Sequence, residues 1–409
     1  MTPSHNITPS SGLKSSIRNF PTIRYLTAGL ILLFATAISG HLRAEKASEK
    51  WFSVVSILKH KEALGRAHDV ELSGNLAFVP GKDGAIAIID IAQPQDPELL
   101  WYKAGLGDSE TALLYGNHLL LGTNDFYSVD ISDPKRPVFL KKVSEPTDLR
   151  IDRINGMVKR GNTVFAANKS GWINAFDIRD IKAPSLSGSL NVTEEYDLMS
   201  PHDIDSFGEF VIIVDPRNFG RSPTGTGKIA IIKAIDRASG QALPADEWVL
   251  AGEIENKQLN GANRVQVSGS FAYTASSYGP ERPIRAPMLG VVDISNPHSP
   301  RYAASVPFDG NHGPNGLTIA GKTAFLAGGE TIEAVDITDP RYPIKLGSQK
   351  LPAGNINPDS SYANGKRKTD NAHDLIYRDG HLYVSCQSDD SFMILKINDE
   401  RIQSLAESR

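Results

Sequence analysis

One unit recurs along most of this chain and constrains the fold more than any other feature. Each copy has a short strand of alternating polarity, a turn containing glycine, two further strands, and a proline-containing turn before a fourth strand. The turn glycines recur every ~51 residues, a period typical of architectures that repeat one small sheet. Seven copies predict an all-β, seven-bladed β-propeller of four-stranded blades, with turn glycines Gly74, Gly116, Gly161, Gly208, Gly269, Gly321 and Gly380.

The end of the third strand is a second, independent marker with the same period. Six copies end this strand on an aspartate, and the seventh has Lys396 instead. We expect each aspartate to cap the following turn by accepting backbone N–H groups. The second proline of the turn falls where the fourth strand begins, and proline in a sheet is tolerated at an edge or a strand start. The fourth strand is therefore predicted to be the outer edge of its blade.

The turn sequences allow a family comparison. Asp-Ile-Ser/Thr-Asp/Asn-Pro, or a close variant, occurs at Asp90, Asp130, Asp293 and Asp336. In this turn the chain resembles the LVIVD-repeat proteins, a family of bacterial β-propellers found mostly outside the cytoplasm. The resemblance covers residues 64–398 and implies a propeller that is exported. The fourth and seventh repeats depart from the pattern, with Asp236-Arg-Ala-Ser-Gly240 and Ile397-Asn-Asp-Glu400.

The last repeat has three clear strands and then only about a dozen residues. The segment Phe52–Lys59 precedes the first repeat and has the pattern of a fourth strand without its first three. We predict that it completes blade seven and closes the ring. The alternative is that Arg401–Ala406 supplies this strand and the N-terminal segment packs elsewhere.

Residues 1–44 differ in character from the rest of the chain. A basic, Ser/Thr/Pro-rich stretch leads into an apolar run at residues 25–38, which is short for a bilayer span and suits a secretory signal. We expect a signal peptide, or alternatively a signal anchor, followed by the propeller over residues 45–409. The predicted location is outside the cytoplasm: periplasmic, secreted or on the cell surface.

Composition excludes several classes of protein. The 43 basic and 47 acidic residues give a net charge of −4, and no basic cluster stands on one face, so a nucleic-acid binder is disfavoured. No membrane contact is expected beyond the N-terminal anchor. The single cysteine, Cys386, excludes an internal disulfide and a CxxC motif.

Strand direction decides which face of the propeller carries function. The rim where each first strand begins also receives the connections between blades and between second and third strands, and the long irregular insertions fall there. Such insertions in a regular repeat commonly serve binding or catalysis. We call this rim the looped face. The first strands begin near the axis with a ring of polar residues: His68, Glu110, Asn155, His202, Asn263, Asn315 and His373.

Three of these positions open a His-Asp-apolar pattern, at His68, His202 and His373. Imidazole nitrogens bind transition metals, so these histidines are candidate ligands of a divalent transition metal at the axis. The alternative is that the ring caps the axis by hydrogen bonds to backbone and water. Further candidate ligand-binding residues near the mouth are His312, Arg217 and Arg282.

Two classes of function remain open. The first is an exported propeller that binds a protein, a glycan or a small ligand on its looped face. The second is a metal-dependent enzyme with the histidines holding the ion. The sequence contains no nucleophile and base at a readable spacing, and it identifies neither substrate, partner nor metal.

The N-terminal pattern makes a prediction that can be tested directly. In the exported form, the mature chain should begin between Gly40 and Glu45, because small residues follow the apolar run there. N-terminal sequencing of protein recovered outside the cytoplasm checks this. Met1 retained on a soluble cytoplasmic form would contradict it.

Overall fold

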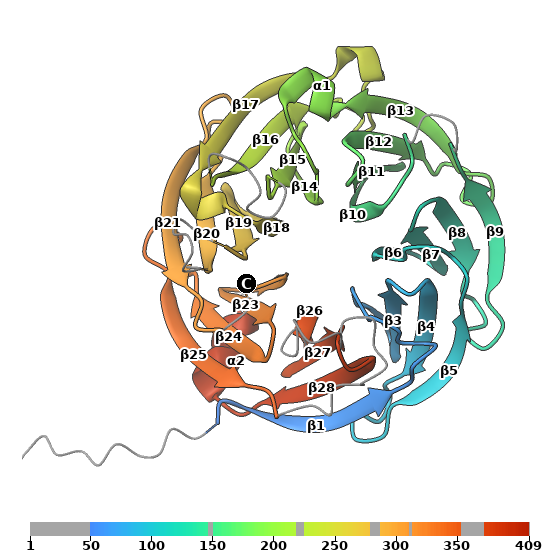
Figure 1. Ribbon diagram of the computed structural model, residues 1–409, viewed down its shortest axis with the longest axis vertical. Coiled ribbons are helices and arrows are strands. Elements are labelled where there is room, and N and C mark those ends of the chain that lie inside the picture. Colours follow the sequence, from blue (N-terminus) through green and yellow to red (C-terminus); the bar gives the residue numbers. More distant parts are fainter. Residues whose placement is uncertain are drawn as a thin grey trace, which may run out of the picture. The chain divides into compact units, whose positions relative to one another are not determined.

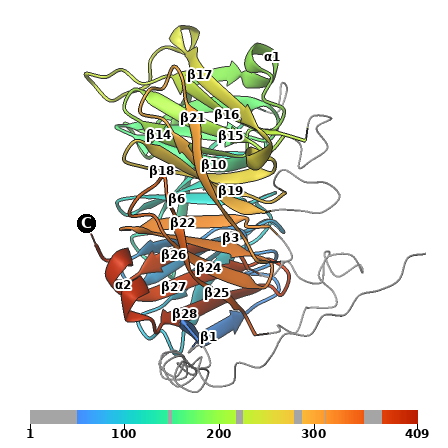
Figure 2. The same cartoon turned by 90° about the vertical axis from the view of Figure 1, so that its left-hand side faces the viewer.

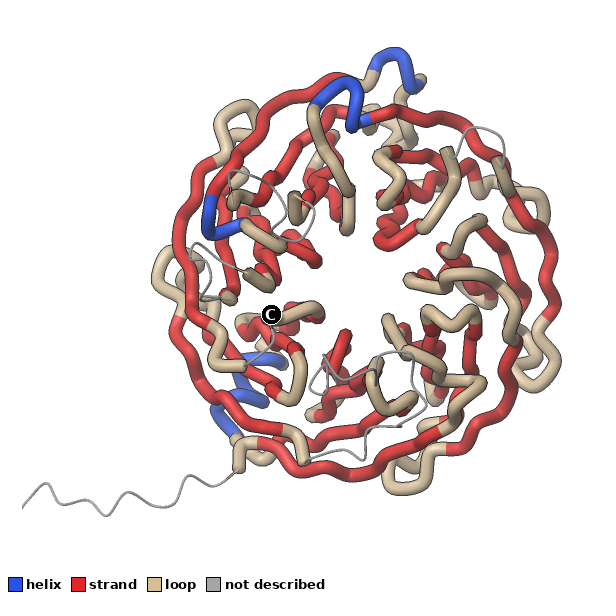
Figure 3. The backbone as a smooth tube through the Cα atoms, in the orientation of Figure 1, coloured by secondary structure: helices blue, strands red, loops and turns tan. Residues whose placement is uncertain are grey.

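The computed structural model describes residues 50–145, 150–217, 225–278, 287–310, 313–352 and 372–408. Seven four-stranded antiparallel sheets are arranged around a central axis, so the predicted seven-bladed propeller is confirmed (Figure 1). In each blade the first strand lies nearest the axis. The fourth strands form the outer circumference (Figure 3).

The strands of the first four blades follow one another in sequence order. Blade 1 contains β2 (Glu71–Ser73), β3 (Leu76–Gly81), β4 (Ala85–Asp90) and β5 (Glu98–Lys103). Blade 2 contains β6 (Thr111–Tyr115), β7 (His118–Gly122), β8 (Phe126–Asp130) and β9 (Val138–Val143). Blade 3 contains β10 (Ile154–Arg160), β11 (Thr163–Asn168), β12 (Trp172–Asp177) and β13 (Ser185–Asn191). Blade 4 contains β14 (Asp203–Phe207), β15 (Phe210–Asp215), β16 (Gly227–Lys233) and β17 (Val249–Asn256).

The remaining blades use the rest of the chain and one strand from its beginning. Blade 5 contains β18 (Ala262–Ser268), β19 (Phe271–Ser276), β20 (Met288–Asp293) and β21 (Arg301–Pro307). Blade 6 contains β22 (Gly316–Ala320), β23 (Thr323–Gly328), β24 (Thr331–Asp336) and β25 (Ile344–Lys350). Blade 7 contains β26 (Ala372–Arg378), β27 (His381–Cys386), β28 (Ser391–Ile397) and β1 (Phe52–Lys59).

The two ends of the propeller meet in blade 7. β1 pairs antiparallel with β28, from Phe52 opposite Ile397 to Lys59 opposite Ser391, which confirms the predicted closure. The alternative closing segment is helical: α2 (Glu400–Ala406) begins after Asp399, whose carboxylate accepts the N–H groups of the first turn. α2 lies on the face opposite α1 (Val192–Tyr196), a helix between blades 3 and 4 (Figure 2). Two short 3-10 helices, η1 (Ala245–Glu247) and η2 (Lys257–Leu259), flank β17.

Local chemistry explains the regular turns. All seven predicted turn glycines have positive φ, between 51° and 73°. Residues with a side chain rarely adopt this backbone conformation. The aspartates that end the third strands cap the next turn as expected: Asp90 Oδ1, for example, accepts the Ala92 N–H at 2.8 Å. Pro97 and the equivalent prolines stand immediately before the outer strands, where a missing N–H is tolerated.

The core is divided among the blade interfaces. Seven clusters of buried apolar side chains occur, one between each pair of neighbouring blades. The middle strands of each blade supply most of these residues, for example Phe78 in blade 1 and Phe325 in blade 6, both fully buried. Each blade therefore depends on both neighbours for its core, and ring closure completes the last interface.

Deletion of residues 45–62 tests this closure. Without β1, strand β28 would expose an unpaired edge, and such edges promote aggregation. We expect a lower melting temperature and concentration-dependent aggregation in light scattering, whereas deletion of residues 1–44 alone should change neither. A monomeric deletion variant with an unchanged melting temperature would contradict this role of β1.

Candidate functional site

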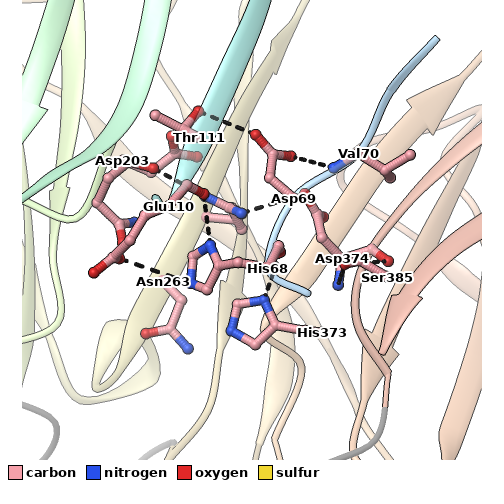
Figure 4. A network of polar contacts seen from close by, with 12 residues as sticks. His68, Asp69, Val70, Glu110, Thr111, Asp203, Asn263, His373, Asp374 and Ser385 are labelled. Atoms are coloured by element: carbon pink, nitrogen blue, oxygen red, sulfur yellow. Dashed lines mark hydrogen bonds and ion pairs between the residues drawn. The ribbon is translucent and has the colours of Figure 1, made fainter. Parts of the chain in front are cut away.

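The candidate site is the axial mouth of the looped face, where the first strands begin. Its predicted ring residues do come together there, and most of them contact the next blade. His68 Nδ1 donates to the Glu110 carbonyl oxygen at 2.6 Å, and His373 Nδ1 donates to the His68 carbonyl oxygen at 2.8 Å (Figure 4). His202 Nδ1 lies 3.0 Å from the Asn263 carbonyl oxygen in the same arrangement. The ring side chains therefore join neighbouring blades.

The carboxamides of the ring act in the same way. Asn155 Nδ2 donates to the His202 carbonyl oxygen at 2.6 Å. Asn263 Nδ2 donates to the side-chain oxygen of Asn315 at 2.7 Å, again in the next blade. The predicted ring thus has the geometry expected of a hydrogen-bonded cap on the axis.

A second ring lies one residue further along each first strand. Asp69 accepts the Ala112 N–H at 3.1 Å, and Asp203 accepts the Val265 N–H at 2.9 Å, both from the next blade. The buried Arg264 donates to Asp374 at 3.2 Å. In the pairs at His68 and His202, the histidine therefore bonds a carbonyl of the next blade, and the aspartate bonds an N–H two residues beyond it. Asp374 of the third pair accepts from Arg264 instead.

Two glycines in this second ring make room for the aspartates. A Cβ on Gly156 would lie 2.2 Å from an Asp203 carboxylate oxygen. A Cβ on Gly316 would lie 2.7 Å from the Asp374 Cα. Both distances are too short for a real Cβ atom. Only glycine at these two positions leaves room for the aspartate of the following blade.

The electrostatics of the second ring follow from burial. Burial raises the pKa of Asp203 to about 7 and that of Asp374 well above its usual range, although Arg264 opposes both shifts. Burial by itself would lower the pKa of Arg264, but the surrounding carboxylates raise it overall. The Arg264 guanidinium therefore keeps its charge, while Asp203 is partly protonated near neutral pH.

The three histidines do not form the predicted metal site. The rings of His68 and His373 lie 4.0 Å apart, but His202 is in blade 4, beside Asn155 and Asn263. Among the residues that the structure describes, no group of three His, Cys, Asp or Glu side chains is placed to hold a metal ion. The reason is that each Nδ1 is directed at the backbone of the next blade, which fixes the rings around the circumference.

The other predicted ligand-binding residues have different outcomes. Arg217 is buried and its Nη1 donates to the carboxylate of Asp197 at 2.9 Å, beside α1. A role for Arg217 in ligand binding stays a prediction. Arg282 and His312 lie outside the described residues.

The apolar run at residues 25–38 also lies outside the described residues. Within the described ranges no helix is long and apolar enough to cross a bilayer.

Glu110 is the exception in the ring, because its carboxylate meets two lysines. Lys82 Nζ lies 3.5 Å from Glu110 Oε2, and Lys169 Nζ contacts the same oxygen. His68 Nε2 is 3.7 Å from this oxygen and makes no hydrogen bond. The carboxylate is 1% exposed, while the lysine side chains are 14% and 12% exposed. We call Lys82, Glu110 and Lys169 the lysine–glutamate cluster.

The cluster shifts the protonation of its members. Burial disfavours the charged form of Glu110, but Lys82 and Lys169 outweigh it and hold the pKa of Glu110 below its usual value. Burial, and then the charge of Lys82, lowers the pKa of Lys169 to about 7. Burial, followed by Glu110, raises the pKa of Asp108, which lies beside the cluster. The cluster thus combines two amines with one firmly ionised carboxylate.

No role was predicted for the two lysines from the sequence, although their shared position in two repeats was a usable signal. Lys82 precedes Asp83-Gly84 in the turn from β3 to β4, and Lys169 precedes Ser170-Gly171 in the turn from β11 to β12. The two lysines therefore hold the same place in repeats one and three. Comparing these turns across repeats would have marked them, but not their convergence on Glu110 of the intervening blade.

The fold and these turns define a β-propeller whose blades are linked by side-chain bonds at the axis. The family model described as "LVIVD repeat" matches this sequence at residues 64–101, 107–144 and 261–307. The chain is thus a seven-bladed β-propeller with LVIVD repeats in three regions, and the expected resemblance is confirmed.

Solved structures support the fold alone. The computationally designed Ika8 protein is 14% identical with a TM-score of 0.52, and the match covers 85% of this chain and 100% of Ika8. The Pan2 WD40 domain of Neurospora crassa is 11% identical with a TM-score of 0.57, over 85% of this chain and 96% of that domain. Among curated proteins, none matches this sequence.

The neutral histidines predict a measurable pH dependence. Burial, and then nearby Lys169, Lys82 and Arg264, lowers the pKa of His202 well below its usual value, so folded His202 stays neutral while the unfolded chain protonates near pH 6.5. This contribution to stability is present above pH ~6.5 and is lost as pH falls. Asparagine occupies this ring position in blades 3 and 5, so His202→Asn keeps a donor toward the next blade.

The comparison of wild type with His202→Asn isolates this histidine from the buried carboxyl groups, which titrate in both proteins. Below pH ~6.5 the wild type should lose stability relative to the variant by up to about 1.4 kcal/mol per pH unit. Urea unfolding at pH 7.5, 6.5 and 5.5 measures the difference. An equal difference at all three pH values would show that folded His202 protonates normally.

Proposed function

We propose that the protein binds a small organic ligand with carboxylate or carbonyl oxygens at the axial mouth of the looped face, through Lys82 and Lys169. One observation carries this proposal. Most of the polar ring side chains bond the next blade. Among the ion pairs and hydrogen bonds of the described residues, the side-chain amines of the two lysines meet only the Glu110 carboxylate. Each ammonium has three donors, so several N–H groups remain for a ligand.

The charge of the cluster favours an anionic or strongly polar oxygen ligand. Glu110 balances one ammonium, and the raised pKa of Asp108 favours the neutral form of that neighbour. Burying a charge without a partner is costly, and such groups are commonly retained at functional sites. A ligand carboxylate would stabilise the ammonium form of the second amine. A small molecule fits this chemistry better than the glycan or protein surface considered from the sequence.

The proposed ligand would be met outside the cytoplasm. The basic start and short apolar run of residues 1–44 support export, as does the resemblance to a family found mostly outside the cytoplasm. Binding of small solutes is a function that suits such a location.

Variants of the cluster test the binding proposal. We expect pyruvate and lactate to bind the wild-type chain, and Lys82→Met or Lys169→Met to weaken the binding of either acid about tenfold or more, since one charge-assisted hydrogen bond contributes about 1.5–3 kcal/mol. Titration calorimetry or ligand-observed NMR provides the measurement. Lys159→Met is the matched control, because Lys159 lies in β10 and reaches Gly161 near the opposite face. Equal affinities for the wild type and both cluster variants would contradict the proposal.

A further inference from the structure

The two lysines of the cluster are not equivalent. Lys169 Nζ is the nearer to Glu110 Oε2, while Lys82 Nζ stands 3.5 Å from that oxygen. Both amines thus approach one oxygen atom from turns of two different blades, on either side of blade 2. Two ammonium groups so close in a poorly solvated place repel each other, and one of them is stabilised by losing its proton.

Lys169 is the amine that loses its proton more readily. Burial and the neighbouring Lys82 charge lower the pKa of Lys169 to about 7, with Glu110 opposing the shift. A lysine beside a second cation in a desolvated setting is an activated nucleophile toward carbonyl groups. Its side chain remains 12% exposed, so it is not sealed in the core.

From this arrangement we propose that Lys169 forms a reversible Schiff base with the carbonyl group of a 2-oxo acid, while Lys82 pairs with the carboxylate of the same molecule. The inference rests on the proposed binding at this mouth and names the ligand class. A 2-oxo acid carries both groups on adjacent carbons, which matches two amines that converge on one point.

The covalent step balances without a further reactant. The neutral Lys169 amine attacks the carbonyl carbon, a C–N bond forms, and the C=O π electrons move to oxygen, which takes up a proton. The resulting carbinolamine loses its hydroxyl group as water after a second protonation, and a protonated imine remains. Overall, an ammonium and a carbonyl give an iminium and water, with no change in net charge.

Two neighbouring groups can move these protons. Glu110 Oε2 contacts the Lys169 amine and can accept its proton, since Lys82 stabilises the ionised carboxylate. His68 is held neutral because burial, followed by His373, lowers its pKa. Its Nδ1 donates to the Glu110 carbonyl oxygen, which leaves the Nε2 lone pair 3.7 Å from the Glu110 carboxylate. We assign Glu110 to proton transfer at the Lys169 nitrogen, and His68 Nε2 to proton exchange with the Glu110 carboxylate.

Reductive trapping of the full chain tests the proposal. Pyruvate is added at pH 7.5 with sodium cyanoborohydride, and each lysine is quantified by peptide mapping in a mass spectrometer. We expect one reduced adduct per chain, at Lys169, forming at least tenfold faster than at the half-buried Lys159. Adducts at equal rates on Lys169 and Lys159, or none at Lys169, would overturn the proposal. This readout uses the wild-type protein and does not depend on whether a variant folds.

Two variants sharpen the result. Lys169→Arg removes the primary amine and should lose the rapid adduct, whereas Lys159→Arg should retain it. In Lys82→Met the repulsion on Lys169 is removed, so its adduct should form more slowly at pH 7.5 and recover toward pH 9.5. A Lys82→Met rate that matches the wild type at both pH values would contradict the role of the paired charges.

Lactate separates this inference from the proposed binding function. It has the carboxylate of pyruvate but no carbonyl group, so it can bind without reacting. If lysine-dependent binding of both acids is found with no adduct at Lys169, the Schiff-base proposal fails and the binding proposal stands. If neither acid binds and no adduct forms, both fail.

Discussion

The structure depends on satisfying the backbone groups that the first strands turn toward the axis. These strands have no neighbouring strand on their inner edge, and buried N–H and C=O groups need partners. Side chains of the preceding blade provide them. His68 and Asp69 bond a carbonyl and an N–H of blade 2, and His202 and Asp203 do the same for blade 5. The repeated His-Asp pair is therefore a structural link between blades, and the seven apolar interfaces are assembled around it.

This requirement separates residues that build the ring from residues that are available for chemistry. The Nδ1 bond holds each imidazole against the next blade, so His202 lies beside Asn263 and is not grouped with His68 and His373. Glu110 occupies a ring position but keeps its carboxylate for Lys82 and Lys169. The lysines come from the turns between second and third strands, and both reach inward to this carboxylate. The proposed function at this mouth therefore rests on these two turns and on Glu110.

The sequence predicted those features of the fold that depend on neighbouring residues or on the repeat. Turn glycines, capping aspartates such as Asp90 and the strand pattern of Phe52–Lys59 depend on neighbouring residues or on the repeat, and they predicted the blades and the closure. The role of the histidines could not be obtained this way, because it depends on which atom of the next blade each Nδ1 meets. The lysine–glutamate cluster joins three blades, and the 3.5 Å between Lys82 Nζ and Glu110 Oε2 is set by the curvature of the ring.

The central claim is that two lysines sharing one buried carboxylate leave one of them neutral near physiological pH. An NMR titration of the lysine side chains, with ¹³C-labelled Cε and Lys169→Arg for assignment, measures this directly. Lys169 should titrate near pH 7, well below the value of about 10.4 that is ordinary for a lysine side chain. A Lys169 signal that titrates together with the exposed lysines would contradict it.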